Sequence, residues 1–187
     1  MRRGFLDLSK ILKFAEERPT LPCGRNQEFR QYSKLCDAIT LNIPETSGWY
    51  FWISSKNEKW GDIIYIGKAD RTSKKNSLRY RINYELKTER ICFWVDVVGE
   101  EKAFNDQHIF FNGRYDKKSK RDLKKAGAKF IVWISDSDVA KHEAREVERI
   151  LIDQYKPRVN VQRAQKNRAF EKAKSVSALF RGYAKRF

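Results

Sequence analysis

Two apolar runs near the middle of the chain constrain its fold most strongly. "GWYFWIS" at 48–54 and "DIIYIG" at 62–67 are rich in aromatic and β-branched residues, and the polar run "SKNEKWG" separates them. Residues of these types favour strands, and two strands this close in sequence pair as an antiparallel hairpin. The chain is therefore expected to build its core around a sheet.

Alternation within the two runs predicts a sheet that is covered on both faces. Trp49 and Tyr50 begin two alternating rows, and both rows are aromatic or aliphatic. In the second run, Ile64 and Ile66 are expected on one face and Tyr65 on the other. Because neither face is polar, helices are expected to pack on each.

A third strand and four helices follow from the remaining patterns. "FIVWIS" at 130–135 predicts a core strand, whereas "ICFWVDVV" at 91–98 is either a strand or part of an inserted element. Helical spacing predicts helices over 5–17, about 27–39, about 77–90, and from a cap at Asp136 or Ser137 up to Pro157. The expected fold class is α+β, with a small three-stranded antiparallel sheet flanked by helices.

The charge of the chain points to a polyanionic partner. Lys and Arg number 40 against 24 Asp and Glu, which gives a net charge of +16 over 187 residues. Nucleic acid is the commonest partner of such a protein. No apolar run approaches the length of a membrane-spanning helix, so no membrane partner is expected.

The cysteines and the N-terminal segment favour a cytoplasmic location. Cys23, Cys36 and Cys92 are odd in number and far apart, which fits reduced thiols better than a disulfide framework or a zinc site. The first residues contain Asp7 and Lys10, so they are interpreted as an amphipathic helix rather than a signal peptide.

Four short motifs occur in order on the expected elements. They are "GWY" at 48–50, "YIGKA" at 65–69, "LRYRI" at 78–82 and "ERILIDQYKPRVN" at 148–160. Together they resemble the GIY-YIG nucleases, and the last motif is similar to the glutamate helix of the excision-repair incision nuclease. The resemblance covers about 48–98 and 129–161.

The resemblance implies a Mg²⁺-dependent (or Mn²⁺-dependent) endodeoxyribonuclease that hydrolyses phosphodiester bonds. It implies that Glu148 anchors the metal, Arg81 holds the phosphate, and Tyr50 or Tyr65 is the general base. These residue types suit the chemistry, since one carboxylate suffices for a hydrated Mg²⁺ and a guanidinium fork matches phosphate oxygens. Neighbouring Lys68 and Arg81 would favour the phenolate form of a tyrosine base.

Simpler interpretations of the same residues stay open. Tyr50 and Tyr65 also fit ordinary sheet aromatics, and Arg81 also fits an ion pair with Glu85 one helical turn on. Helical periodicity alone does not distinguish Glu148 from Glu143; the spacing to "KPRVN" selects Glu148.

Four further residues are expected to support the site. Gly67 would let the backbone approach a phosphate, Lys68 would add positive charge, and Asn160 ends the last motif. The family commonly carries a tyrosine or histidine one turn after the arginine. Here that position is Glu85, and Tyr84 precedes it by one residue.

Basic side chains outside the motifs are expected to contact DNA phosphates. They lie in a loop after the hairpin, in a basic segment at 113–129 and in the C-terminal tail. The expected DNA-binding residues are Lys74, Lys75, Arg114, Lys117, Lys118, Lys120, Arg121, Arg163, Lys166 and Arg168.

The expected organisation has three parts. An N-terminal helical extension covers 1–46, the nuclease-like core covers 47–161 with a basic insertion at about 99–128, and a basic tail covers 162–187. Compactness favours a restriction-like or viral enzyme over a homing or repair enzyme. Double-stranded DNA is the expected partner, with a homodimer or higher oligomer as an option. The alternative function is an inactive nucleic-acid-binding protein that retains the fold.

Overall fold

A four-stranded antiparallel sheet forms the centre of the computed structural model, which describes residues 1–18, 26–56, 59–71, 73–88, 128–157, 160 and 170–184. The elements in chain order are β1 (Arg2–Asp7), α1 (Ser9–Glu16), α2 (Gln27–Thr40), β2 (Gly48–Lys56), β3 (Lys59–Ala69), the short 3₁₀ helix η1 (Lys74–Asn76), α3 (Leu78–Thr88), β4 (Ala128–Ser135), α7 (Lys141–Tyr155) and α8 (Phe170–Ala184). The α+β class and the hairpin of β2 with β3 are confirmed.

The prediction of three strands is wrong, because the first residues of the chain add a fourth. The sheet order is β1-β4-β2-β3. A helix was expected over 5–17, but residues 2–7 pair antiparallel with β4, with Phe5 opposite Val132. This pairing satisfies backbone groups that β4 would otherwise leave open at its edge. The helix begins only at Ser9, so residues 2–7 of the N-terminal extension belong to the sheet.

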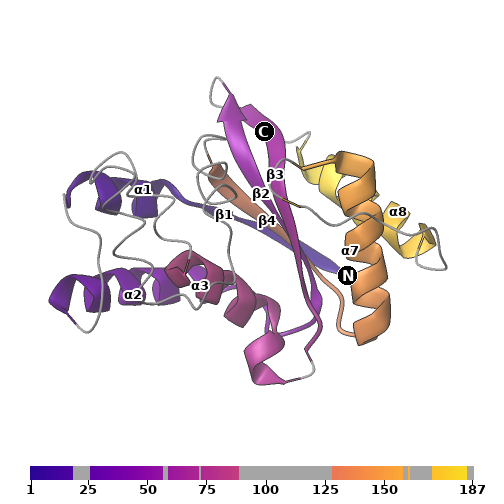
Figure 1. The fold of residues 1–187 in the computed structure, drawn as a ribbon, viewed down its shortest axis with the longest axis horizontal. Coiled ribbons are helices and arrows are strands. Elements are labelled where there is room, and N and C mark those ends of the chain that lie inside the picture. Colours follow the sequence, from indigo (N-terminus) through magenta and orange to yellow (C-terminus); the bar gives the residue numbers. More distant parts are fainter. Residues whose placement is uncertain are drawn as a thin grey trace.

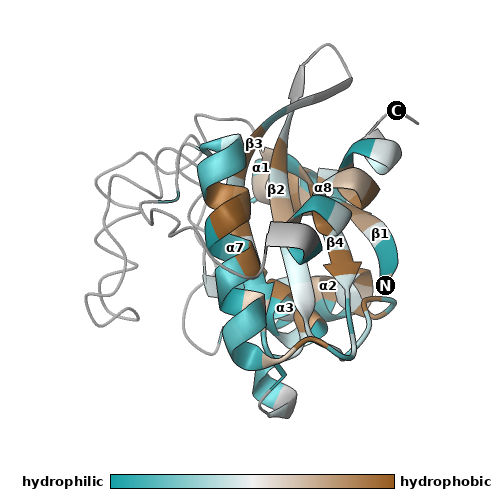
Figure 2. Ribbon diagram, turned by 90° about the vertical axis from the view of Figure 1, so that its right-hand side faces the viewer, coloured by the Kyte–Doolittle hydropathy of each residue, from teal (hydrophilic) through white to brown (hydrophobic). Residues whose placement is uncertain are grey.

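Helices cover both faces of the sheet, as the two apolar rows predicted. In Figure 1, α1, α2 and α3 lie on one side of the strands, and α7 and α8 lie on the other. Tyr50 and Trp52 belong to the first core, whereas Trp49 and Phe51 belong to the second. The surface of α7 alternates between hydrophobic and hydrophilic (Figure 2), as expected for a helix with one buried face.

A register irregularity in β3 changes the predicted faces of that strand. Tyr65 is opposite Trp52 and Ile63 is opposite Ile53, so Ile64 has no direct partner in the hairpin. Such a bulge breaks the alternation of side chains. Ile64 therefore packs in the core on the α3 side and Ile66 in the core on the α7 side, which corrects their expected common face.

Helix α7 begins later than the sequence predicted. Its N-cap is Ala140, not Asp136 or Ser137. Asp136 is engaged elsewhere, because it accepts a hydrogen bond from the backbone N–H of Asp138 and one from Lys172 Nζ of α8 at 2.6 Å. The carboxylate therefore joins the turn before α7 to α8 instead of capping α7.

The described part of the tail is a core element. Helix α8 buries Val176 and Phe180, and the Phe180 ring stacks on Phe51 with centroids 4.7 Å apart. The segment at 91–98, predicted as a strand or part of an insertion, lies outside the described residues. So does the predicted basic insertion at about 99–128, apart from Ala128. In the part of the chain that is described, no helix has the length and apolarity to cross a bilayer.

Candidate active site

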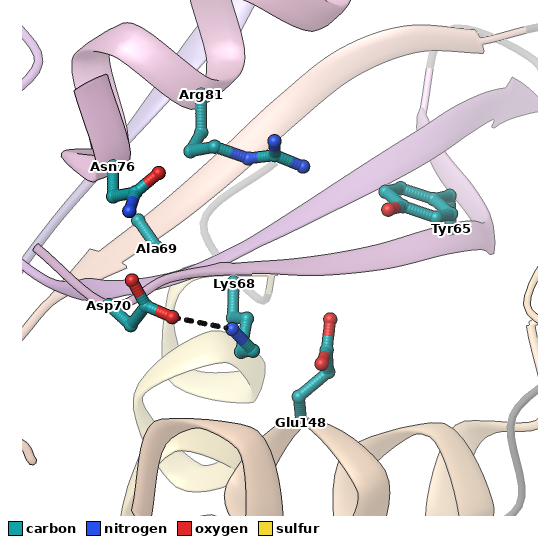
Figure 3. A pocket seen from close by; sticks show the side chains of 7 residues that line it. All are labelled: Tyr65, Lys68, Ala69, Asp70, Asn76, Arg81 and Glu148. Carbon is teal, nitrogen blue, oxygen red and sulfur yellow. Dashed lines mark hydrogen bonds and ion pairs between the residues drawn. The ribbon is translucent and has the colours of Figure 1, made fainter. Parts of the chain in front are cut away.

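A polar cleft lies at the open edge of the sheet, beside β3. Its volume is about 340 Å³, and it is lined by Tyr65, Lys68, Ala69, Asp70, Asn76, Arg81 and Glu148. Because β3 is an edge strand, helices on opposite faces of the sheet can both reach past it. Arg81 enters from α3 and Glu148 from α7, with Tyr65 and Lys68 between them on the strand (Figure 3).

Two sets of hydrogen bonds fix α7 and residue 160 against the hairpin. Trp49 of β2 donates its indole N–H to the carbonyl oxygen of Ala144 at 3.0 Å, one turn before Glu148. Asn160 uses both ends of its amide on the backbone of Ile66, accepting from the N–H and donating to the C=O at 2.8 Å each. Asn160 thus holds the outer edge of β3 next to Tyr65.

Glu148 has the properties of a cation ligand. Among the described residues it forms no hydrogen bond or ion pair, and burial raises the pKa of its carboxyl to about 7, although Lys68 opposes that shift. Glu143, the other candidate on this helix, lies 3.8 Å from Lys172 and does not line the cleft. Of the two glutamates, Glu148 is the one that lines the cleft.

A hydrated divalent cation fits this donor set. The described residues contain no group of three or more His, Cys, Asp or Glu side chains arranged to hold a metal. Mg²⁺ does not need such a group, since it keeps several waters and binds through one or two carboxylates. Cleft-lining Glu148 meets that requirement.

The two candidate tyrosines have different surroundings. Tyr65 lines the cleft, whereas Tyr50 is fully buried and donates its hydroxyl hydrogen to the carboxylate of Glu85. Burial, followed by the nearby Glu85 charge, raises the pKa of Tyr50 well above its usual value. The expectation that basic neighbours would favour a phenolate is therefore wrong for Tyr50.

Gly67 makes room for the ring of Tyr50. The two residues are opposite each other in the hairpin, and a Cβ on Gly67 would lie 2.3 Å from Tyr50 Cζ and 2.6 Å from Cε2. Such distances are far below van der Waals contact. The glycine is needed for packing inside the hairpin, which differs from the predicted approach of backbone to phosphate.

Glu85 links the buried tyrosine to the cleft arginine. Its side chain is on the apolar face of α3 and the residue is only 4% exposed. Arg81 Nη2 donates to the same Oε1 atom that accepts from Tyr50, at 3.2 Å. The neighbouring Tyr50 and then Glu85 raise the pKa of Arg81 against the opposing effect of its burial. Burial raises the pKa of Glu85 against the opposing charge of Arg81.

Glu85 was not predicted as a site residue, although a signal existed. A glutamate among Leu78, Ile82 and Leu86 on one helical face requires a buried partner. Asp70 and Asn76 were also missed. Asp70 pairs with Lys68 at 3.0 Å.

The other predicted residues lie outside the cleft or outside the described residues. The Tyr84 ring is exposed and stacks on Tyr80, and exposed Lys75 lines a second groove between α2 and α3. The Lys74 side chain and Arg114, Lys117, Lys118, Lys120, Arg121, Arg163, Lys166 and Arg168 are outside the described part.

Comparison with known proteins gives structural neighbours only. No family model and no curated protein matches the sequence. Two similar solved structures are point mutants of the GIY-YIG N-terminal endonuclease domain of UvrC from Thermotoga maritima, both bound to the catalytic divalent cation. They are 21% and 20% identical to this chain, each with a TM-score of 0.36, and the alignments cover 73% of this chain and 99% of the neighbour.

Proposed function

We propose that the chain is a metal-dependent endodeoxyribonuclease that hydrolyses phosphodiester bonds in DNA. One observation carries the proposal: Tyr65, Arg81 and Glu148 come from three separate elements and line one cleft. A base, a permanent cation and a metal-binding carboxylate are the groups that phosphodiester hydrolysis requires. Ordinary sheet packing would not bring these three side chains to a common polar space.

Arg81 and Lys68 would hold the scissile phosphate. The Arg81 guanidinium is fixed on one side by Glu85, and its side chain is 33% exposed, so its remaining N–H groups are available to phosphate oxygens. Lys68 lies on the strand between Asp70, which its Nζ contacts at 3.0 Å, and Glu148 (Figure 3). Glu148 would hold Mg²⁺ or Mn²⁺, which when bound supplies Lewis-acid stabilisation of the developing charge on phosphate.

Tyr65 is the better candidate for the general base. It lines the cleft, where an attacking water would lie, whereas Tyr50 is buried and its hydroxyl is committed to Glu85. A phenol that donates to a carboxylate inside the core is poorly suited to accept a proton from water. Tyr50 and Glu85 instead act as positioning residues that orient Arg81.

The substrate is proposed to be double-stranded DNA, and the role restriction-like or viral. The net charge of +16 supports a nucleic-acid partner, and the predicted phosphate contacts from the basic loop, insertion and tail would extend the cleft's positive field. A homodimer would allow both strands to be cut. The alternative is a binding protein that retains the fold without turnover.

A plasmid assay separates the two functions. Supercoiled plasmid is incubated with the full chain and either Mg²⁺ or a chelator, and nicked product and protein-bound DNA are both measured. We expect nicking with Mg²⁺ and none with chelator. Binding without nicking under all metal conditions would leave the inactive binding protein as the better account.

A further inference from the structure

Helix α3 carries two exposed aromatic rings beside the arginine of the cleft. Tyr80 and Tyr84 are each 40% exposed, and their rings stack with centroids 6.1 Å apart and planes within 13°. Residues three apart on a helix are surface neighbours, so Tyr84 lies next to Arg81. The ring pair therefore borders the position proposed for the scissile phosphate.

The surroundings of the rings are apolar and basic. Tyr80 lines a groove of about 360 Å³ together with Leu41, which is 63% exposed, and Lys75. Lys75 belongs to η1, whose next residue, Asn76, lines the catalytic cleft. The short helix thus contributes a lining residue to the cleft and one to the groove.

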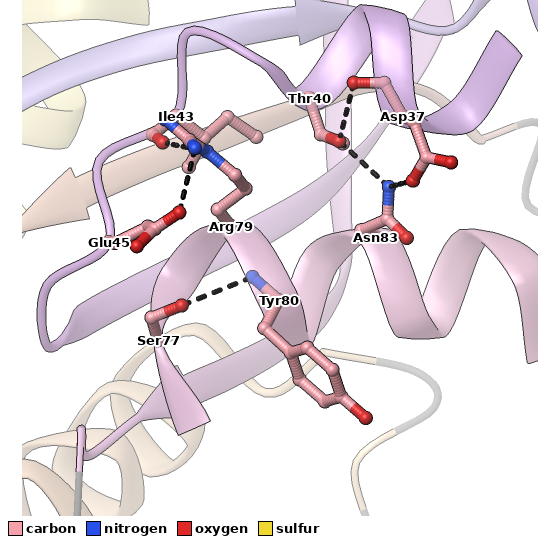
Figure 4. Close-up of polar contacts among 8 residues, drawn as sticks. All are labelled: Asp37, Thr40, Ile43, Glu45, Ser77, Arg79, Tyr80 and Asn83. Carbon is pink, nitrogen blue, oxygen red and sulfur yellow. Dashed lines mark hydrogen bonds and ion pairs between the residues drawn. The ribbon is translucent and has the colours of Figure 1, made fainter. Parts of the chain in front are cut away.

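The two carboxylates of the groove are already neutralised by cations. Asp37 accepts from Lys87 Nζ at 2.7 Å, and Glu45 accepts from Arg79 Nη1 at 2.8 Å. Figure 4 shows the Tyr80 ring directed away from this polar network. An anionic ligand that approaches the rings would therefore not meet an uncompensated negative charge from either residue.

We propose that Tyr80 and Tyr84 form a stacking platform for an unpaired nucleobase next to the phosphate at Arg81. The inference rests on the proposed function and narrows its substrate class to DNA with an unpaired nucleotide at the cleavage point. Tyrosine rings stack on the face of any base, but a base within a duplex has no free face to offer. Lys75 supplies charge complementarity to the adjoining backbone, which favours nucleic acid over an apolar protein segment.

Fluorescence of a base analogue tests the platform without cleavage. Two DNA hairpins that differ at one position are compared in chelator: in one a single 2-aminopurine has no nucleotide opposite it, and in the other it is paired with thymine. We expect the full chain to bind the unpaired form at least about fivefold more tightly, because a base stack on an aromatic ring is worth roughly 1–3 kcal/mol, and to quench its fluorescence.

Matched variants separate stacking from helix stability. Tyr80→Leu and Tyr84→Leu keep apolar bulk and should abolish the preference and the quenching, whereas Tyr80→Phe and Tyr84→Phe should retain both. Equal binding of the two hairpins by the unaltered chain would overturn the proposal. So would Leu variants that weaken both hairpins equally, or that instead dissociate a dimer in sedimentation.

Failure of the platform and failure of the nuclease proposal are distinguishable. Nicking of plasmid with Mg²⁺ but no preference for the unpaired base would reject the platform alone. A ring-dependent preference without nicking under any metal condition would reject the nuclease and retain the platform as a binding site.

Discussion

The hydroxyl of Tyr50 donates a hydrogen bond to the carboxylate of Glu85 inside the core, and Arg81 donates to the same carboxylate oxygen from the edge of the cleft. A chain of three polar groups thus runs from the centre of the sheet to the proposed phosphate site. Its inner end is sterically fixed, because Tyr50 lies against Gly67. The arrangement gives the two hairpin tyrosines different roles and makes each role testable.

Tyr65→Phe should reduce the single-turnover rate of DNA cleavage by about 10²–10⁴-fold, the usual contribution of a general base. Tyr50→Phe should reduce it less, by about tenfold, because it removes a hydrogen bond that orients Arg81 and not the group that takes the proton. The rates are measured at saturating protein. A larger loss in Tyr50→Phe than in Tyr65→Phe would reverse the assignment.

Glu85→Gln should lower kcat by about 10-fold to 100-fold while KM stays constant or falls. The amide no longer fixes the guanidinium as firmly, but the cleft gains net positive charge for the substrate. Glu45→Gln is the matched control, since Glu45 pairs with Arg79 of the same helix outside the catalytic cleft. Equal effects of the two variants, or a rise in KM alone, would contradict a positioning role for Glu85.

Gly67→Ala should lower the free energy of unfolding by about 1–3 kcal/mol, the usual cost of overpacking. The added methyl would lie within 2.6 Å of ring atoms of Tyr50. Urea unfolding measures this change, and a Tyr50→Ala background should remove most of it because the clash disappears. An equal decrease in the free energy of unfolding in both backgrounds would show that the clash with Tyr50 is not the cause of the destabilisation.

Glu148 should make the metal-free protein less stable as pH rises. Burial raises its folded-state pKa to about 7 from the ordinary 4.5, so the folded state binds more protons than the unfolded state between those values. The stabilisation is complete below about pH 4.5 and is lost as pH rises through 7. Melting temperatures in chelator across this range should fall less steeply for Glu148→Gln. Identical slopes would contradict the raised pKa.

The sequence predicted those helices and strands whose own residues show a clear apolar pattern. The hairpin, the strand at 130–135 and the helices around Arg81 and Glu148 each follow from short runs of apolar residues. Tyr65, Arg81 and Glu148, which the motifs singled out, line one cleft. The choice of Glu148 over Glu143 needed the motif, since both lie at the edge of the same apolar arc.

Features that depend on distant partners were not predictable in the same way. Strand β1 forms because β4, more than a hundred residues later, has an open edge. Phe5 of β1 and Leu8, which follows the strand, also fit helical spacing. The irregularity at Ile64 follows from the pairing with β2, and it turns Tyr65 toward α3. Glu85 was visible as a polar residue on an apolar face, but its partner Tyr50 lies 35 residues away.

Single-turnover nicking by Glu148→Gln tests the central claim most directly. The variant and the unaltered chain are compared at equal DNA binding over a range of Mg²⁺ concentrations, with Mg²⁺-dependent thermal stabilisation measured in parallel. If Glu148 holds the catalytic metal in a cleft with Tyr65 and Arg81, nicking should fall by at least about 100-fold and the stabilisation by Mg²⁺ should disappear. Nicking that survives the substitution would contradict the proposed site.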